Sequence, residues 1–231
     1  MKKLLALIPV LSLSLAALIA CKKDEGTDTT DLSKVAAMYA ISQPTKVVAT
    51  TTHQFGSKTL TGTYELKTGY IDGTTPAATY KSEYQQMRDV ASGSGQEIVN
   101  PIEDVTELIE YVEGKGTRTT LNGKRGSWNK EGEAIIPAKG AIALNLDGEV
   151  ITQFTYENDV LTFTVPAAGT ETVLGMQIDA DVLVAVTTNG TEVIGVSISY
   201  TEAANAETNV EQTVVTIKVD YYYDLQVITI G

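Results

Sequence analysis

The residue types that most often carry catalysis or bind metals are scarce in this chain of 231 residues, which contains one cysteine, Cys21, and one histidine, His53. A zinc site needs several clustered ligands, and neither residue has a second member of its kind. A serine nucleophile for His53 would be expected in a Gly-x-Ser-x-Gly turn, which the sequence lacks. We therefore expect a structural role for His53, no cofactor and no enzyme activity, with a hydrolase as an alternative.

Carboxylates are numerous, and two arrangements of them could bind a cation. The run from Asn145 to Glu149 resembles half of a calcium loop, but that pattern would place Ala143 and Phe154 at its first and last ligand positions. Asp147-Gly148 is therefore interpreted as a hairpin turn. Asp179 and Asp181 stand two apart on an expected strand, so both project from one face. For that pair we favour solvation, with weak cation binding or a glycosidase-like acid pair as alternatives.

Cys21 has a clearer context, because it follows two lysines and an apolar run from Leu4 to Ala20. This pattern is typical of a secretory signal peptide. The residues Leu18-Ile19-Ala20-Cys21 resemble the lipobox of bacterial lipoproteins. The resemblance implies cleavage before Cys21, diacylation of its sulfur and anchoring of the mature protein to a membrane outside the cytoplasm. That membrane would be the outer membrane or cell surface in a diderm, and the outer leaflet of the cell membrane in a monoderm.

The signal peptide is expected to span 1–20, a polar tether 21–31, and a single β-rich domain 32–231. The mature chain has no second cysteine, so its stability must come from the core rather than from disulfides. Charge is unevenly distributed: residues 140–231 contain 13 acidic residues and one basic residue, Lys218. This excess of negative charge disfavours nucleic acid as a partner.

Two segments show helical spacing of apolar residues. The first is expected from about Leu32 to Ile41 with Asp31 as its cap, and the second over 101–113, where Asn100 and Pro101 resemble a helix start. Most other segments alternate apolar and polar residues, which indicates antiparallel strands with one buried face. The expected strands lie near 46–55, 58–70, 77–90, 141–146, 149–156, 160–165, 174–186 and 213–230, with a hairpin at Asn189-Gly190 and a return strand that directs Ile194, Val196, Ile198 and Tyr200 inward.

The last predicted strands are unusually long, since strands average about 5–6 residues. Long strands twist and curl, which favours a strongly curved antiparallel sheet, or half-barrel, with the two helices on its concave face. The fold class is thus mainly β with two helices. The signal, size and order of elements resemble the half-barrels of lipoprotein carriers such as LolA and of mycobacterial lipid-binding lipoproteins. This resemblance implies an amphipathic ligand between sheet and helices.

Tyrosine is the dominant aromatic residue, and its ring and hydroxyl suit an amphipathic ligand. The expected ligand-binding residues are Tyr64, Tyr70, Tyr80, Tyr84, Tyr221, Tyr223 and Trp128. The same tyrosines could instead pack in the core. Trp128 ends a basic, glycine-rich stretch that begins at Lys115 and could touch anionic headgroups or form a solvated loop. The alternative function is an envelope or surface module that binds a protein or glycan, has a filled core and uses a contact patch around Arg118–Trp128.

Overall fold

A computed structural model describes residues 30–87, 90–91, 98–99, 102–132, 143–146, 150–204 and 211–231. The signal peptide, Cys21 and nearly all of the tether lie outside the described residues. The two helices are α1 (Thr30–Ile41) and α2 (Thr170–Leu174), the latter preceded by the 3-10 turn η1 (Ala167–Gly169). Neither helix of the described part is long and apolar enough to cross a membrane.

The strands are β1 (Lys46–Phe55), β2 (Lys58–Ile71), β3 (Thr75–Met87), β4 (Val90–Ala91), β5 (Ile98–Val99), β6 (Ile102–Val112), β7 (Gly116–Leu121), β8 (Lys124–Arg125), β9 (Phe154–Glu157), β10 (Val160–Val165), β11 (Val182–Thr188), β12 (Val193–Glu202), β13 (Thr213–Tyr222) and β14 (Gln226–Val227). Eleven of them form one path in the order β8-β7-β6-β3-β2-β1-β13-β12-β11-β10-β9. Neighbours on this path are antiparallel, whereas β14 pairs with β2 in parallel.

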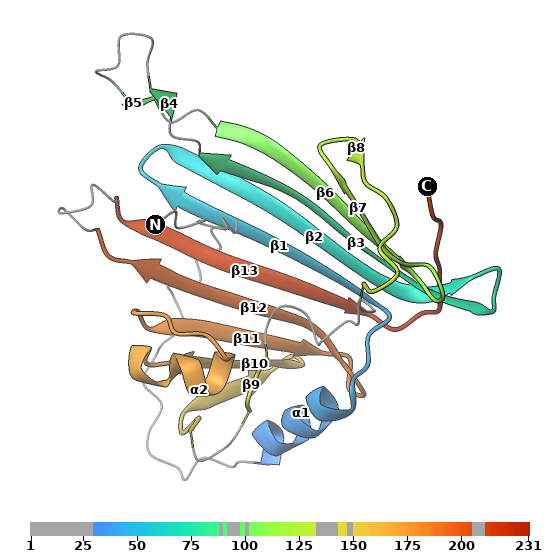
Figure 1. Cartoon of the computed structure of the whole chain (residues 1–231). Coiled ribbons are helices and arrows are strands. Elements are labelled where there is room, and N and C mark those ends of the chain that lie inside the picture. The colour runs from blue at the N-terminus through green and yellow to red at the C-terminus, as the bar shows by residue number, and fades with distance from the viewer. Residues whose placement is uncertain are drawn as a thin grey trace.

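The sheet is curved and open, with β8 and β9 at its two edges (Figure 1). α1 packs beside β9, β10 and β12, on the face that we call the inner face. The predicted fold class, mainly β with two helices and a long curved antiparallel sheet, is confirmed.

The inner face of β13 shows why these residues form strands. Val215, Ile217, Val219 and Tyr221 alternate with polar residues, and all four are buried in the main core. α1 contributes buried apolar side chains to the same cluster, among them Val35. Alternation with a period of two matches the pleat of a strand, so one face of β13 is buried and the other is partly exposed to solvent. β13 ends at Tyr222, so the prediction of one strand over 213–230 is correct only in its first half.

The predicted helix over 101–113 is wrong, because this segment forms β6. Its stripe of apolar residues fits a helix, but the segment is also rich in β-branched residues, which favour strands. β6 pairs with β3 along its whole length and with β7 along its second half, and these hydrogen bonds stabilise the strand over the helix. Pro101, which was predicted to start the helix, lies outside the described residues.

Four further strand predictions need correction. The segment 174–186 begins in α2, where Gly175 ends the helix with a left-handed backbone at φ 66°, and only β11 from Val182 is a strand. Residues 143–146 have no strand, and β9 begins at Phe154 rather than at 149. The register shifts between Thr187 and Thr188, so Val193 is buried and Ile194 is exposed instead of inward.

The core makes a direct prediction about stability. Leu161 on β10 is completely buried in the main core, so Leu161→Ala should lower the free energy of unfolding by about 2–5 kcal/mol through lost burial and a residual cavity. Urea unfolding measures the change. The matched control is Leu183→Ala on neighbouring β11, where the side chain is 37% exposed and the change should stay within about 0.5 kcal/mol. Equal losses in both variants would contradict the assignment of inner and outer faces.

Candidate functional site

Three of the predicted ligand-binding tyrosines come together on the inner face of β2 and β3. Tyr64 on β2 lies opposite Ser82 on β3, and Tyr84 lies opposite Gly62. Tyr80 lies opposite Leu66, two residues from Tyr64 along the strand. Directly opposed residues share a face, so all three rings project on the same side. We call Tyr64, Tyr80, Tyr84 and the residues around them on this side the tyrosine face.

The rings of the tyrosine face are stacked along the sheet. The ring centroid of Tyr64 lies 6.4 Å from that of Tyr80, with 25° between the ring planes. Its centroid lies 6.5 Å from that of Tyr84, with an interplanar angle of 15°. Gly62 leaves room for this arrangement, because a Cβ atom there would lie 3.0 Å from the Cβ of Tyr84 and 3.3 Å from the hydroxyl oxygen of Tyr64. All three tyrosines are half-buried, so part of each ring is accessible.

The hydroxyls of Tyr64 and Tyr80 stay protonated at neutral pH. Burial raises the pKa of Tyr64, and it raises the pKa of Tyr80 to about 12, helped by the neighbouring Tyr64 and by the carboxylate of Glu107. A protonated phenol both donates and accepts a hydrogen bond. The tyrosine face therefore offers apolar ring surface together with neutral polar groups.

β6 supplies the residues of this face that the sequence interpretation missed. Ile109 lies opposite Tyr80, Glu107 opposite Ser82, and Tyr111 opposite Ala78. They were missed because 101–113 was interpreted as a helix, in which these positions would not share a face. The signal that could have found them was the share of β-branched residues in this segment, Ile102, Val105, Thr106, Ile109 and Val112, which favours a strand.

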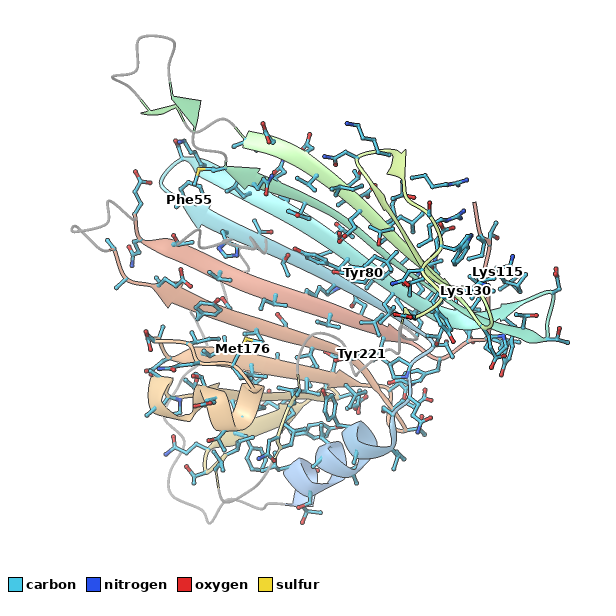
Figure 2. All side chains as sticks on the ribbon, in the orientation of Figure 1. Phe55, Tyr80, Lys115, Lys130, Met176 and Tyr221 are labelled. Carbon is cyan, nitrogen blue, oxygen red and sulfur yellow. The ribbon has the colours of Figure 1, made fainter. Side chains whose placement is uncertain are left out.

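The other predicted ligand-binding residues lie elsewhere. Tyr221 is buried in the main core, and the hydroxyl of Tyr223 donates a hydrogen bond to the carbonyl oxygen of Val193. Tyr70 is exposed near the end of β2. Trp128 packs on the outer face, against the small cluster of Ala77, Val112 and Ile228. Figure 2 shows Tyr80 on the part of the sheet away from the helices, and Met176 and Tyr221 nearer to them.

The interface between the sheet and the two helices is filled with side chains. Leu32 and Val35 of α1 and Val173 and Leu174 of α2 are at most 1% exposed, and all belong to the main core. The helix that was expected to bound a ligand space at 101–113 is a strand. A ligand between sheet and helices would have to displace core residues, whereas a ligand on the tyrosine face would not.

The outer face of β6 and β7 contains a buried ion pair. Arg118 on β7 lies directly opposite Glu110 on β6, and its guanidinium contacts Glu110 Oε2 at 2.6 Å and 2.8 Å. Arg118 also donates to the carbonyl oxygen of Gly231, and the Gly231 N–H donates to Glu110 Oε1. The guanidinium lies 4.6 Å from the ring centre of Trp128. Arg118 is therefore a buried structural residue and not part of an exposed contact patch.

The acidic residues singled out as possible cation ligands have ordinary roles. Asp181 accepts a hydrogen bond from the backbone of Ala167 at the start of η1, and Asp179 accepts one from the side chain of Gln177. They do not lie on a strand. Among the described residues, no group of three or more histidine, cysteine or acidic side chains could hold a metal ion. The calcium-like run includes 147–149, which lie outside the described residues.

The fold and site define an open, curved β-sheet protein with a half-exposed aromatic face.

No family model matches the chain, and no curated protein matches it in sequence. The chain is similar to a DUF1329 family protein from Desulfovibrio piger, with 9% identity, a TM-score of 0.26, and coverage of 84% of this chain and 93% of that one. It is also similar to MucB in complex with MucA(peri), with 10% identity, a TM-score of 0.13, and coverage of 85% and 100%. The Pseudomonas aeruginosa MucA/MucB complex gives 9% identity, a TM-score of 0.12 and the same coverage. Similarity at these TM-scores carries no functional argument, so function must be argued from the residues of the chain itself.

His53 makes a prediction about the pH dependence of stability. Burial lowers the pKa of His53 from 6.5 to about 4, so between these values the unfolded chain binds a proton that the folded protein does not. Stability should therefore fall as the pH drops from about 6.5 to 4, by about 1–2 kcal/mol once partial solvent contact is allowed for. The measurement is urea unfolding at several pH values. His53→Leu should remove this part of the slope, and an unchanged slope in the variant would contradict the assignment.

The buried ion pair makes a second stability prediction. Glu110→Gln leaves the guanidinium of Arg118 buried without its carboxylate, which should cost about 3–5 kcal/mol of unfolding free energy. Fluorescence of the neighbouring Trp128 can follow the unfolding. The control is Glu83→Gln, whose partner Lys81 forms an exposed pair that should contribute at most about 1 kcal/mol. A small effect of Glu110→Gln would show that the pair is dispensable for the outer face.

Proposed function

We propose that this protein is a lipid-anchored, extracytoplasmic and non-catalytic lipoprotein that binds an amphipathic ligand on its tyrosine face. The observation that carries the ligand-binding part is the row of stacked, half-exposed tyrosines Tyr64, Tyr80 and Tyr84. The anchor rests on the lipobox resemblance at Cys21. A short tether would then hold the sheet close to the membrane.

The chemistry of the tyrosine face suits a ligand with both apolar and polar parts. Tyrosine rings, Leu66 and Ile109 supply apolar surface, since they share the inner side of neighbouring strands. The protonated tyrosine hydroxyls and the carboxylate of Glu107 supply polar groups beside the same surface. Binding sites typically combine a mainly apolar lining with a few polar groups that orient the ligand.

The surroundings of His53 support a non-catalytic role. The Nε2 atom of His53 is buried and has no hydrogen-bond partner in the described part of the chain. Its direct neighbours across the sheet are Val215 and Leu60, both apolar. A general base must reach the proton that it removes, and a side chain between two aliphatic residues has no such partner.

The filled sheet–helix interface favours a second candidate, an envelope or surface module that binds a protein or a glycan. Sugar rings and protein side chains also pack on tyrosine, so the same face could serve this function. The two candidates differ in what copurifies with the protein: a bound amphiphile in the first case, and no small molecule in the second.

Lipid extraction of the purified mature protein, followed by mass spectrometry, tests the first candidate. An amphiphile should be recovered from the wild type. Tyr64→Ala/Tyr80→Ala should weaken binding about 30-fold, as the loss of two ring contacts of about 1 kcal/mol each would give. The matched control is Tyr222→Ala, which removes an exposed tyrosine from the outer face of β13 and should leave recovery unchanged.

Recovery of no amphiphile from the wild type would contradict the first candidate and favour the interaction module. Recovery that is equal in all three proteins would show that the ligand does not lie on the tyrosine face.

A further inference from the structure

The most exposed apolar side chains of the described residues gather at one end of the sheet. Val227, Ile41 and Leu225 are 79%, 76% and 75% exposed, more than any other large apolar residue in that part of the chain. Tyr70 and Tyr222 are exposed near them. We call these five residues the apolar end. Single exposed apolar residues are common, but several together usually mark a contact surface.

Backbone hydrogen bonds bring the apolar end together from three segments of the chain, 41–45, 69–70 and 222–227. Gln226 and Val227 of β14 pair with Gly69 and Tyr70 of β2. The backbone N–H of Thr45, four residues after Ile41, donates to the carbonyl oxygen of Tyr222. The hydroxyl of Thr45 donates to the carbonyl oxygen of Asp224, next to Leu225. Figure 1 shows the C-terminus and the β2–β3 hairpin at the same end of the sheet.

The exposure of Val227 follows from the contacts of its neighbour Ile228 in the C-terminal tail, residues 223–231. The N–H of Ile228 donates to the carbonyl oxygen of Tyr70, and the side chain of Ile228 is buried in the outer cluster. Successive side chains of an extended segment point to opposite sides, so burial of Ile228 on the outer face directs Val227 to the opposite side, where it is exposed. Gly69 permits the close approach of β14, because a Cβ atom there would lie 2.0 Å from the carbonyl oxygen of Gln226.

The tether limits what can cover this surface. Nine residue steps separate Cys21 from Thr30, so the chain between them spans at most about 30 Å. α1 is twelve residues long, about 18 Å, and ends at Ile41 in the apolar end. The tether is therefore long enough to run back from Thr30 to the level of Ile41. A membrane that holds Cys21 can reach the apolar end, and tethering raises its effective concentration there.

We propose that the apolar end lies in the interface of the membrane that holds Cys21, with Ile41, Leu225 and Val227 inserted among the headgroups and upper acyl chains. This inference rests on the lipid anchor of the proposed function. Aliphatic side chains with tyrosines around them are the residue types that enter this layer of a bilayer. The contact sets the orientation of the sheet above the membrane, which the lipid alone would leave free.

Charges of both signs lie toward this end of the sheet, where Figure 2 also shows Lys115 and Lys130. Lys46 near Tyr222 is already paired with Glu65, and Asp224 adjoins Leu225. Burial of apolar area is therefore expected to hold the apolar end at the membrane, and added salt should not release it.

The test uses the mature, lipidated protein in vesicles of phosphatidylcholine with brominated acyl chains, which quench nearby tryptophan. Trp128 is the single native tryptophan, so Trp128→Phe gives a dark background. In that background, Leu225→Trp should lose roughly half of its fluorescence relative to unbrominated vesicles, as a ring at the boundary of headgroups and acyl chains would. The same loss should persist at high salt.

The matched control is Leu121→Trp in the same background. Leu121 is 50% exposed and is the last residue of β7. The first residue of β7, Gly116, lies toward the apolar end, because it pairs with Val112 of β6, which pairs with Ala77 of β3. Leu121 is therefore at the end of β7 that is away from the apolar end. Its fluorescence should be the same in brominated and unbrominated vesicles. Both variants replace an exposed leucine, so a difference between them reports position alone.

The outcomes separate this inference from the anchor. A chain that does not float with the vesicles overturns both the anchor and the inference. A chain that floats, with Leu225→Trp unquenched or with both probes quenched equally, overturns the inference and leaves the anchor standing. A blue shift of Leu225→Trp that depends on protein concentration without vesicles would also overturn it, because a second copy of the chain would then cover the apolar end.

Discussion

The pairing of β1 with β13 holds the structure together. It joins Lys46–Phe55 to Thr213–Tyr222 through ten opposed residue pairs, and β1 uses the same ten residues on its other edge to pair with β2. This pairing links β1, β2, β3, β6, β7 and β8 to β9–β13 in one sheet, whereas β4 and β5 pair only with each other. Because this pairing closes a very long stretch of chain, its entropic cost is high, and the apolar inner residues of both strands must offset it.

The two parts of the sheet on either side of this pairing have different surroundings. From β1 to β9 the inner face, with α1 and α2, forms the main core, against which Tyr64 and Leu66 of β2 also pack. From β2 to β6 the same face carries the half-exposed tyrosines, and the smaller cluster lies on the outer face with the Glu110–Arg118 pair. The tail after β13 crosses to that outer face and completes it. The candidate binding face is thus the part of the inner face that extends beyond the helices, and the tail stabilises it from behind.

Strands whose pattern is purely local were predictable from the sequence. The spans 46–55 and 160–165 agree with β1 and β10, because alternation of apolar and polar residues specifies both the strand and its buried face. The prediction for the segment 101–113 was wrong because its apolar residues fit helical spacing. Pairing with β3 and β7 makes this segment a strand, and the Arg118–Glu110 ion pair across β6 and β7 is part of that pairing. The predicted strands 174–186 and 213–230 are longer than the observed ones. The first begins in α2, which ends at Gly175, and in the second β13 ends at Tyr222.

The sequence by itself predicted a mainly β fold, because alternation over long segments favours a curved antiparallel sheet. It also predicted a lipoprotein signal from the lipobox resemblance at Cys21. It also identified tyrosine as the side chain suited to a ligand. Only the tertiary structure decided which tyrosines act together. Tyr64, Tyr80 and Tyr84 meet through the register of β2 and β3, whereas Tyr221, with the same local pattern, is buried under α1. Register and helix packing are properties of segments far apart in the chain, so local spacing specifies which face a residue occupies but not what covers that face.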